Sequence, residues 1–160
     1  MLLAMKIRYV RENDNILKVI KLSQGDWLDL ATAEDVTLTK GDFYLISLGV
    51  RIQLPKGFEA HLVPRSSTFK KWGIMQGNSI GIIDNSYQGR KDIWKFPAYA
   101  IRKTSIPKAT RICQFRIVPS MNAGFWVKLK WLFTKKVEFV EEEYISDENS
   151  SRGGFGSTGN

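Results

Sequence analysis

The chain has 160 residues, of which 43% are hydrophobic, and a net charge of +8. Its length suits one domain, and no apolar run approaches the roughly 20 residues that span a bilayer. The lone Cys113 excludes an intramolecular disulfide framework, and with only His61 beside it the chain has no Cys/His metal cluster, so a reducing cytoplasm fits.

The charge is unevenly distributed. Lys and Arg predominate up to residue 137, whereas residues 138–151 carry acidic and no basic side chains. A basic body attracts phosphate from a nucleotide, a nucleic acid or an anionic membrane, although dispersed lysines also form ordinary solvated surfaces. The stretch Met1–Met5 is too short for a signal peptide, so we expect no export; Met5 is an alternative start.

The first third of the chain predicts short strands. β-branched and aromatic residues alternate at 6–10, 16–22, 35–39 and 43–54, with turn residues between them. Asp26 and Asp29 bracket Trp27 and Leu28, which is unusual for a plain strand. One of these carboxylates is therefore expected to have a buried partner.

Residues 58–67 predict a strand that stops at Pro64, followed by a short helix over 68–73. Arg65 supplies a planar donor fork beside two serines, which is a suitable seat for phosphate. Alternatively, Ser66 is only a helix N-cap, and Arg65 is a structural ion-pair partner, for example of Asp29.

The stretch 75–89 predicts a β-hairpin whose backbone faces a ligand. Gly77, Asn78 and Gly81 permit positive φ, so the arms can come close enough to grip a small flat molecule. Asp84 is a candidate for ordering a water, and Tyr87 for walling the slot. The alternative is a surface turn with a solvated Asp and a half-buried Tyr.

Two strands are predicted next, at 92–102 and 111–118. Trp94 is expected in the core, and Gln114 points to the face opposite Cys113 and Phe115. The aromatic stretch 125–133 fits both a period of two and a helical period, and we predict a strand. A basic amphipathic helix on a membrane, or packing between subunits, are the alternatives.

The end of the chain changes character. After the acidic residues 138–151, the Gly-rich residues 152–160 cannot build a core and predict a mobile arm. This arm carries Arg152, Phe155, Ser157 and Thr158, which can close over a phosphate and a base. Ordering it costs about 1 kcal/mol per residue in backbone entropy, so we expect it to order only with ligand bound.

Taken together, these segments resemble the motifs of the homotrimeric dUTPases, in the form found in Gram-positive bacteria and their phages. The resemblance rests on five segments in order: Asp29-Leu with Glu34-Asp35, Pro64-Arg-Ser-Ser67, 78–89, Arg111-Ile-Cys-Gln114 and Gly154-Phe-Gly-Ser-Thr-Gly159. It implies an all-β, distorted jelly-roll subunit over residues 1–151, with residues 152–160 as an arm that closes the active site of a homotrimer.

The implied activity is hydrolysis of dUTP to dUMP and pyrophosphate in the cytoplasm. It keeps uracil out of DNA and supplies dUMP for thymidylate synthesis. Mg²⁺ would be held by the triphosphate and waters, with no protein ligand, and neither nucleic acid nor membrane would be a partner. One alternative is a dCTP deaminase of the same fold, but that enzyme uses a Glu at the amino group of the base, and residues 88–92 after Tyr87 contain none. The other alternative is a non-catalytic module that binds a regulatory protein.

The resemblance also implies a role for each matched residue. Asp84 would hold the 3′-hydroxyl and orient the attacking water, and Asp29 would act through Arg65 or metal-bound waters. The implied uracil and sugar contacts are Asn78, Gly81, Ile82, Ile83 and Tyr87. The implied phosphate contacts are Ser66, Ser67 and Gln114, with Arg152, Gly156, Ser157 and Thr158 from the arm, while Phe155, with Trp94 as a further candidate, would cover the base. The interval from Gln114 to Arg152 is longer than usual for the family.

Overall fold

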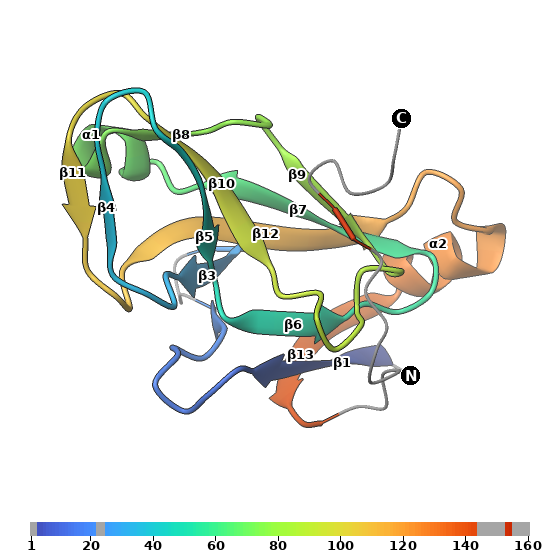
Figure 1. The fold of residues 1–160 in the computed structure, drawn as a ribbon. Helices are drawn as coiled ribbons and strands as arrows, with labels where there is room; N and C mark the ends of the chain where they lie inside the picture. Colours follow the sequence, from blue (N-terminus) through green and yellow to red (C-terminus); the bar gives the residue numbers. More distant parts are fainter. Residues whose placement is uncertain (1–2, 22–24, 144–152, 155–160) are drawn as a thin grey trace.

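The computed structural model describes residues 3–21, 25–143 and 153–154, and these form an all-β molecule with two short helices (Figure 1). In chain order the strands are β1 (Leu3–Arg11), β2 (Ile20–Lys21), β3 (Leu28–Ala31), β4 (Val36–Leu38), β5 (Phe43–Ser47), β6 (Val50–Gln53), β7 (Phe58–Pro64), β8 (Ile74–Gln76), β9 (Gly81–Asp84), β10 (Lys95–Ala100), β11 (Thr104–Ile106), β12 (Arg111–Pro119) and β13 (Thr134–Glu141). The helices are α1 (Thr68–Trp72) and α2 (Phe125–Leu132).

The strands form small sheets that wrap around one core, as expected of a distorted jelly-roll. The largest has the order β2-β3-β12-β7-β9, and the others are β13-β1-β6, β5-β10-β8 and β11-β4. The long strand β12 lies antiparallel between β3 and β7 and holds the largest sheet together. The predicted all-β class is therefore confirmed.

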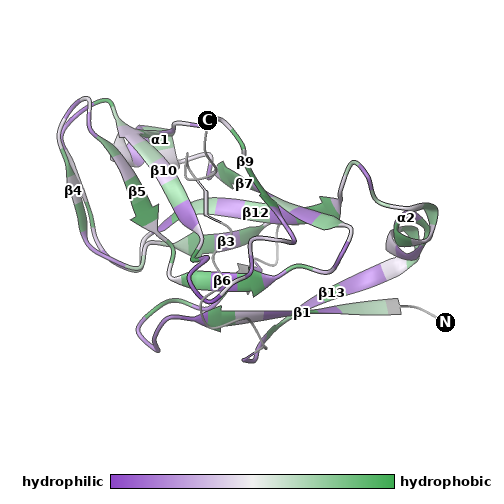
Figure 2. Cartoon of the chain, turned by 45° about the vertical axis from the view of Figure 1, so that its right-hand side comes forward, coloured by the Kyte–Doolittle hydropathy of each residue, from purple (hydrophilic) through white to green (hydrophobic). Residues whose placement is uncertain are grey.

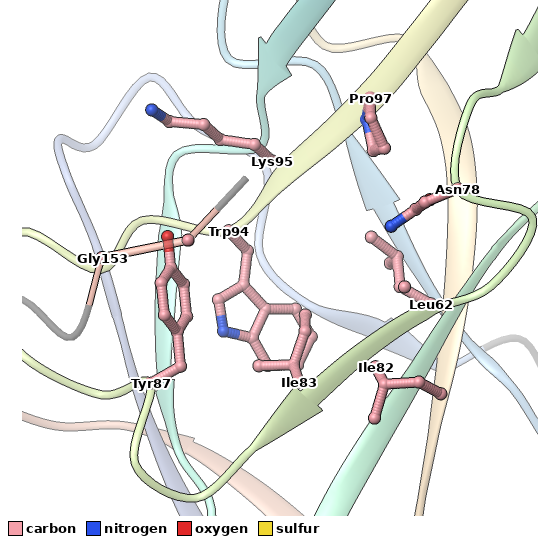
Figure 3. A pocket seen from close by; sticks show the side chains of 11 residues that line it. Leu62, Asn78, Ile82, Ile83, Tyr87, Trp94, Lys95, Pro97 and Gly153 are labelled. Carbon is pink, nitrogen blue, oxygen red and sulfur yellow. The ribbon is translucent and has the colours of Figure 1, made fainter. Parts of the chain in front are cut away.

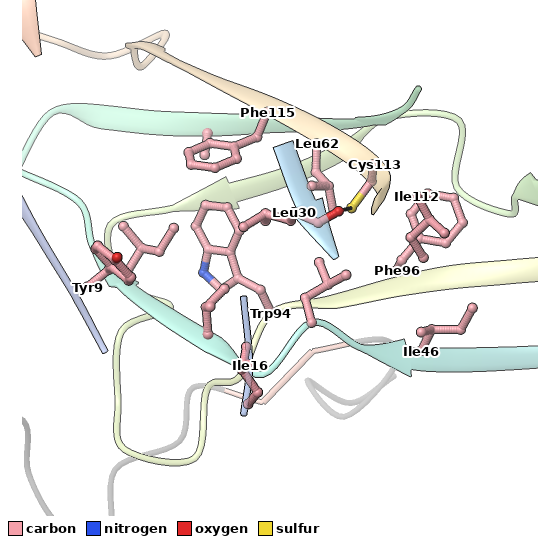
Figure 4. Close-up of a cluster of buried hydrophobic side chains, with 14 of the residues drawn as sticks. Tyr9, Ile16, Leu30, Ile46, Leu62, Trp94, Phe96, Ile112, Cys113 and Phe115 are labelled. Carbon is pink, nitrogen blue, oxygen red and sulfur yellow. Dashed lines mark hydrogen bonds between the residues drawn. The ribbon is translucent and has the colours of Figure 1, made fainter. Parts of the chain in front are cut away.

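The core lies between these sheets and is centred on aromatic side chains (Figure 4). Trp94, Phe96 and Phe115 are fully buried, and the rings of Trp94 and Phe115 meet edge to face at 5.1 Å. Burial of one such side chain is worth about 1.5–3 kcal/mol. Trp94 is thus a core residue, as predicted.

The strand and short helix predicted over 58–73 are confirmed. β7 ends at Pro64, and α1 ends at Gly73, whose φ of 62° is the left-handed conformation that glycine adopts at little cost. The helix N-cap is Ser67, not Ser66, and its side chain makes no capping hydrogen bond. Thr68 instead ties the helix down by donating from its hydroxyl to the Ile112 carbonyl at 2.6 Å.

The hairpin over 75–89 differs from the predicted one. Its arms do not pair with each other: β8 pairs with β10, and β9 pairs with β7, so the two arms belong to different sheets. The positive φ falls on Ser79, at 60°, and not on Gly77, Asn78 or Gly81. The reason is that the turn reverses between two sheets and does not close a two-stranded ladder.

The strand predicted for 125–133 is wrong, because residues 125–132 form the helix α2. A helical period places Val127 and Trp131 on one side; there Trp131 packs edge to face on Phe58 at 5.6 Å, and Val127 lies over Gly57. The opposite side leaves Trp126 and Leu132 about three-quarters exposed, and Figure 2 shows this hydrophobic helix at one end of the molecule. Within the described residues, no helix is long and apolar enough to cross a membrane.

Two other segments complete the comparison. Of the strand predicted over 16–22, the described residues 16–21 have strand only at Ile20–Lys21. The acidic segment that begins at Glu138 is partly strand, because β13 lies parallel to β1. Both α2 and β13 lie in the long interval between Gln114 and Arg152.

Candidate active site

A cavity of about 310 Å³ opens beside the reversal between β8 and β9 (Figure 3). Five predicted ligand residues line it: Asn78, Gly81, Ile82, Ile83 and Tyr87. Sequence reasoning missed the other lining side chains, which are Leu62, Lys95 and Pro97, and named Trp94 only as a further candidate. These residues come from β7, from β10 and from the position just before β10. A local sequence pattern does not show which strands lie beside each other, so it could not place them at the cavity.

Gly81 lets the two walls of this cavity approach each other. It pairs with Leu62 across β9 and β7, and a Cβ at Gly81 would lie 3.3 Å from the Leu62 Cβ. That separation is tighter than ordinary van der Waals contact, so a larger residue would push the strands apart. The glycine is required for close approach and not for an unusual φ.

Asp84 ends β9 and Tyr87 lies just after it, and neighbouring groups hold both side chains. The Asp84 Oδ1 accepts hydrogen bonds from the Ser86 N–H at 2.8 Å and from the Ser86 hydroxyl at 2.5 Å, which orient the carboxylate. The Tyr87 hydroxyl donates to the Ile93 carbonyl at 3.2 Å, so its ring stands as a wall of the cavity. Burial, followed by the charge of Asp92, raises the pKa of Tyr87 and keeps it protonated.

Asp29 has the buried partners that its setting predicted. It is 3% exposed, and its Oδ2 lies 3.0 Å from the Arg65 Nε and 3.2 Å from the Arg111 Nη1. The suggested ion pair between Arg65 and Asp29 is thus present. Arg111, which the sequence argument did not assign to the site, is the second cation. A buried carboxylate between two guanidinium groups holds them in place and has little access to solvent.

These cations line a second concavity of about 390 Å³. Ser67 and Lys71 also line it, and Ser66 is exposed at the same turn after β7. Gln114 lies opposite Asp29 across β3 and β12, and its Nε2 donates to the Pro64 carbonyl at 3.4 Å. The arrangement is a cationic, hydroxyl-bearing surface of the kind that binds phosphate.

The two concavities share no lining residue among those described. Asn78, Gly81, Ile82, Ile83 and Tyr87 gather at one; Arg65 and Ser67 gather at the other. One subunit therefore presents the candidate base pocket and the candidate phosphate surface separately.

The predicted arm is only partly visible. Gly153 and Gly154 line the base pocket, where a Cβ at Gly154 would lie 3.6 Å from the Tyr87 ring. The predicted site residues Arg152, Phe155, Gly156, Ser157 and Thr158 lie outside the described residues. Within the described ranges, no group of three or more His, Cys, Asp or Glu side chains could hold a metal ion.

The fold defines a jelly-roll protein, and its cavity lies beside β9. The dUTPase family model matches residues 22–159. The chain therefore belongs to the dUTPase family.

Two relatives align with almost the whole chain. It is 48% identical over 154 residues to the SPbeta prophage-derived deoxyuridine 5′-triphosphate nucleotidohydrolase YosS of Bacillus subtilis, covering 96% of each chain. It is 34% identical to the deoxyuridine 5′-triphosphate nucleotidohydrolase of a Hydrogenobaculum species, again over 96% of each.

Solved structures share the fold. The crystal structure of the dUTPase from Streptococcus mutans matches with a TM-score of 0.64 at 21% identity, over 71% of this chain and 95% of that one. A mutant dUTPase from phage phi11 of S. aureus, described as coordinating a structural Mg(II) ion, matches with a TM-score of 0.63 at 18% identity, over 74% and 94%.

Proposed function

We propose that this chain hydrolyses dUTP to dUMP and pyrophosphate. The observation that carries the proposal is the base pocket of a dUTPase-family chain, in which the Asn78 amide faces the cavity and Tyr87 and Asp84 follow on the next arm. The near-complete match to a phage-derived nucleotidohydrolase supports it.

Uracil would enter the cavity that lies beside β9 and is also lined by Lys95 and Pro97 of β10. Asn78 and the backbone of Gly81, Ile82 and Ile83 would bind its polar edge, and the close contact between Gly81 and Leu62 would leave no room for the methyl group of thymine. The Tyr87 ring would lie beneath the deoxyribose and exclude a 2′-hydroxyl.

In the reaction, a water oxygen attacks the α-phosphorus and the bond to the oxygen that bridges to the β-phosphorus breaks. Asp84 would hold the 3′-hydroxyl, orient the water and accept its proton. A carboxylate in this position contributes about 10²–10⁴ in rate. The leaving pyrophosphate carries away the bridging oxygen.

Negative charge on the phosphates would be stabilised by preorganised donors. Ser66, Ser67 and Gln114 would bind the α- and β-phosphates beside the Arg65 guanidinium. Arg65 is held by its Nε at Asp29, and within the described residues its terminal nitrogens have no other partner, so they can donate to phosphate. Asp29 would thus act indirectly, by holding Arg65 in position.

The proposed cofactor is Mg²⁺. Magnesium retains several waters and commonly binds through substrate phosphates. This fits a surface that offers hydrogen-bond donors to phosphate and, among the described residues, no group of three metal-binding side chains. When bound, the ion neutralises charge on the triphosphate. The Mg(II) ion of the phage phi11 relative supports its presence in the family.

The proposed assembly is a homotrimer in which subunits share sites. Its support is the separation of the base pocket from the phosphate surface on one subunit, which a neighbouring subunit would overcome. The arm would complete the site, with Arg152, Ser157 and Thr158 at the γ-phosphate, Gly156 beside them and Phe155 on the base. The proposal places the enzyme in the cytoplasm, where the buried thiol of Cys113 would stay reduced.

The decisive experiment incubates the purified chain with Mg²⁺ and, separately, dUTP, dTTP, dCTP and UTP. Pyrophosphate is expected from dUTP at a much higher rate than from the other three. Absence of pyrophosphate from dUTP would overturn the proposal, and ammonia released from dCTP would replace it with a deaminase of the same fold.

A further inference from the structure

Behind the base pocket lies a buried glutamine that the proposed mechanism does not use. Gln76 is the last residue of β8 and is 8% exposed. Its Nε2 donates one hydrogen bond to the Leu62 carbonyl at 3.0 Å and another to the Asn78 Oδ1 at 2.9 Å. Its Oε1 is buried and has no hydrogen-bond partner among the residues that the structure describes.

These contacts allow only one orientation of the Gln76 amide. The Leu62 carbonyl can only accept, so the amide must turn its NH₂ group toward it. A flipped amide would place two oxygens against each other. Because the second N–H then points at Asn78, that side chain must present its Oδ1 to Gln76 and its NH₂ to the cavity, which is what Figure 3 shows.

The orientation of Asn78 matters for the choice of base. Position 4 of uracil carries a carbonyl, which accepts a hydrogen bond, whereas position 4 of cytosine carries an amino group, which donates. In the proposed binding mode, the Asn78 NH₂ group meets position 4 of the base, where it would pair with uracil and oppose cytosine. Bound cytosine would leave the buried NH₂ group of Asn78 unpaired, and such an unpaired donor discriminates strongly against the wrong base.

We infer that Gln76 is a positioning residue that makes the pocket select uracil over cytosine by fixing the orientation of the Asn78 amide. This inference rests on the proposed function and names a specificity determinant within it. The unpartnered Oε1 favours such a role over simple packing, because a methionine would fill the space without burying an unpaired acceptor. Gly81 makes room for the arrangement, since a Cβ there would lie 3.4 Å from the Gln76 Nε2.

The test compares kcat and KM for dUTP and dCTP in the wild-type chain, Gln76→Met and Gln76→Glu. Gln76→Met removes both donors at similar volume, so the preference for dUTP in kcat/KM should fall roughly tenfold, mainly through KM for dUTP. In Gln76→Glu the carboxylate can only accept a hydrogen bond, so the Asn78 amide should flip. The Asn78 Nδ2 would then donate to the carboxylate and the Asn78 Oδ1 would face the cavity, so the preference for dUTP should fall further. The matched control is Gln53→Met on β6, which removes a 2.8 Å hydrogen bond from Arg8 and should leave the preference unchanged.

A second set of variants, made in Asn78→Ala, tests whether Gln76 acts through Asn78. In Asn78→Ala, adding Gln76→Met should cause no further loss of preference. An unchanged preference in a folded Gln76→Met, or an equal loss with and without Asn78, would overturn the inference. Relative affinities for dUMP and dCMP, measured by calorimetry, give the same comparison without turnover, so failure of the inference is distinguishable from failure to hydrolyse dUTP.

The wild-type chain provides a measurement that does not depend on the variants folding. The side-chain amide protons of Gln76 should exchange with solvent much more slowly than those of an exposed amide, because both are hydrogen-bonded in a buried site. Exchange as fast as that of an exposed glutamine would overturn the inference.

Discussion

Two carboxylates of the candidate site differ in their surroundings, and this difference fits the different roles proposed for them. Asp29 is buried between Arg65 and Arg111, so its charge is matched and its contact with water is small. Asp84 is partly exposed at the end of β9, and Ser86 orients one of its oxygens. Asp84 is therefore the group suited to order a water, and Asp29 the group suited to hold a cation.

Asp84→Asn tests this assignment. The amide keeps the size of the side chain but is a poor proton acceptor, so nucleotide binding should persist while kcat falls by about 10²-fold or more. Steady-state kinetics and calorimetry with dUMP measure the two effects. Asp14→Asn, at an exposed side chain, is the control. Near-normal turnover in Asp84→Asn would remove Asp84 from the proposed role.

Among the strands, β13 shows how opposite charges at the two ends of the chain meet. Glu141 accepts from the Arg11 Nε at 2.7 Å, Glu142 pairs with Lys6 at 2.6 Å, and Glu143 pairs with Arg51. The hydrogen bond from Arg11 holds the pKa of Glu141 below its usual 4.5, and Lys6 does the same for Glu142. The acidic segment thus docks on the basic β1.

These pairs predict a pH-dependent stability. Because the folded pKa of Glu141 is depressed, its contribution is present above the unfolded value of 4.5 and is lost as pH falls through the folded pKa. Glu141→Gln should therefore lower the free energy of unfolding at neutral pH by at most about 1 kcal/mol, since the pair is solvent-screened, and have no effect in strong acid. Thermal melts at both pH values, with the exposed Glu12→Gln as control, measure this. An equal loss at both would contradict it.

For the whole molecule, the main feature is a site in separate pieces. Among the described residues, the base pocket and the phosphate surface share no lining residue, and Gly153 and Gly154 line the base pocket. The proposed shared site would join these pieces across subunits and would make activity depend on assembly.

Deletion of residues 152–160 tests the arm at this scale. Its Gly-rich sequence is not expected to build a core, so the trimer should persist, while loss of Arg152, Ser157 and Thr158 should reduce turnover of dUTP by at least about tenfold through lost charge-assisted hydrogen bonds. Light scattering and pyrophosphate release measure the two properties. Full activity without the arm would contradict its part in the site, and a monomer with full activity would contradict the shared site.

Local patterns were sufficient where one period and clear turn residues agreed. Alternation bounded by Gly and Pro identified the strands at 58–64 and 111–118, and a carboxylate beside Trp27 and Leu28 indicated the buried pairing of Asp29. The single strand predicted over 43–54 is instead two strands, β5 and β6, which belong to different sheets. The ordered motifs were specific enough to indicate the family. These features depend on neighbours along the chain, which the amino-acid order states directly.

Long-range packing settled the rest. Residues 125–132 fit two periods equally, and contact of Trp131 with Phe58 made them a helix. The parallel pairing of β13 with β1, the second cation at Asp29 and the position of Gln76 behind Asn78 each join residues through the folded sheets. Such contacts have no local signature, because their free energy arises only once distant strands have come together.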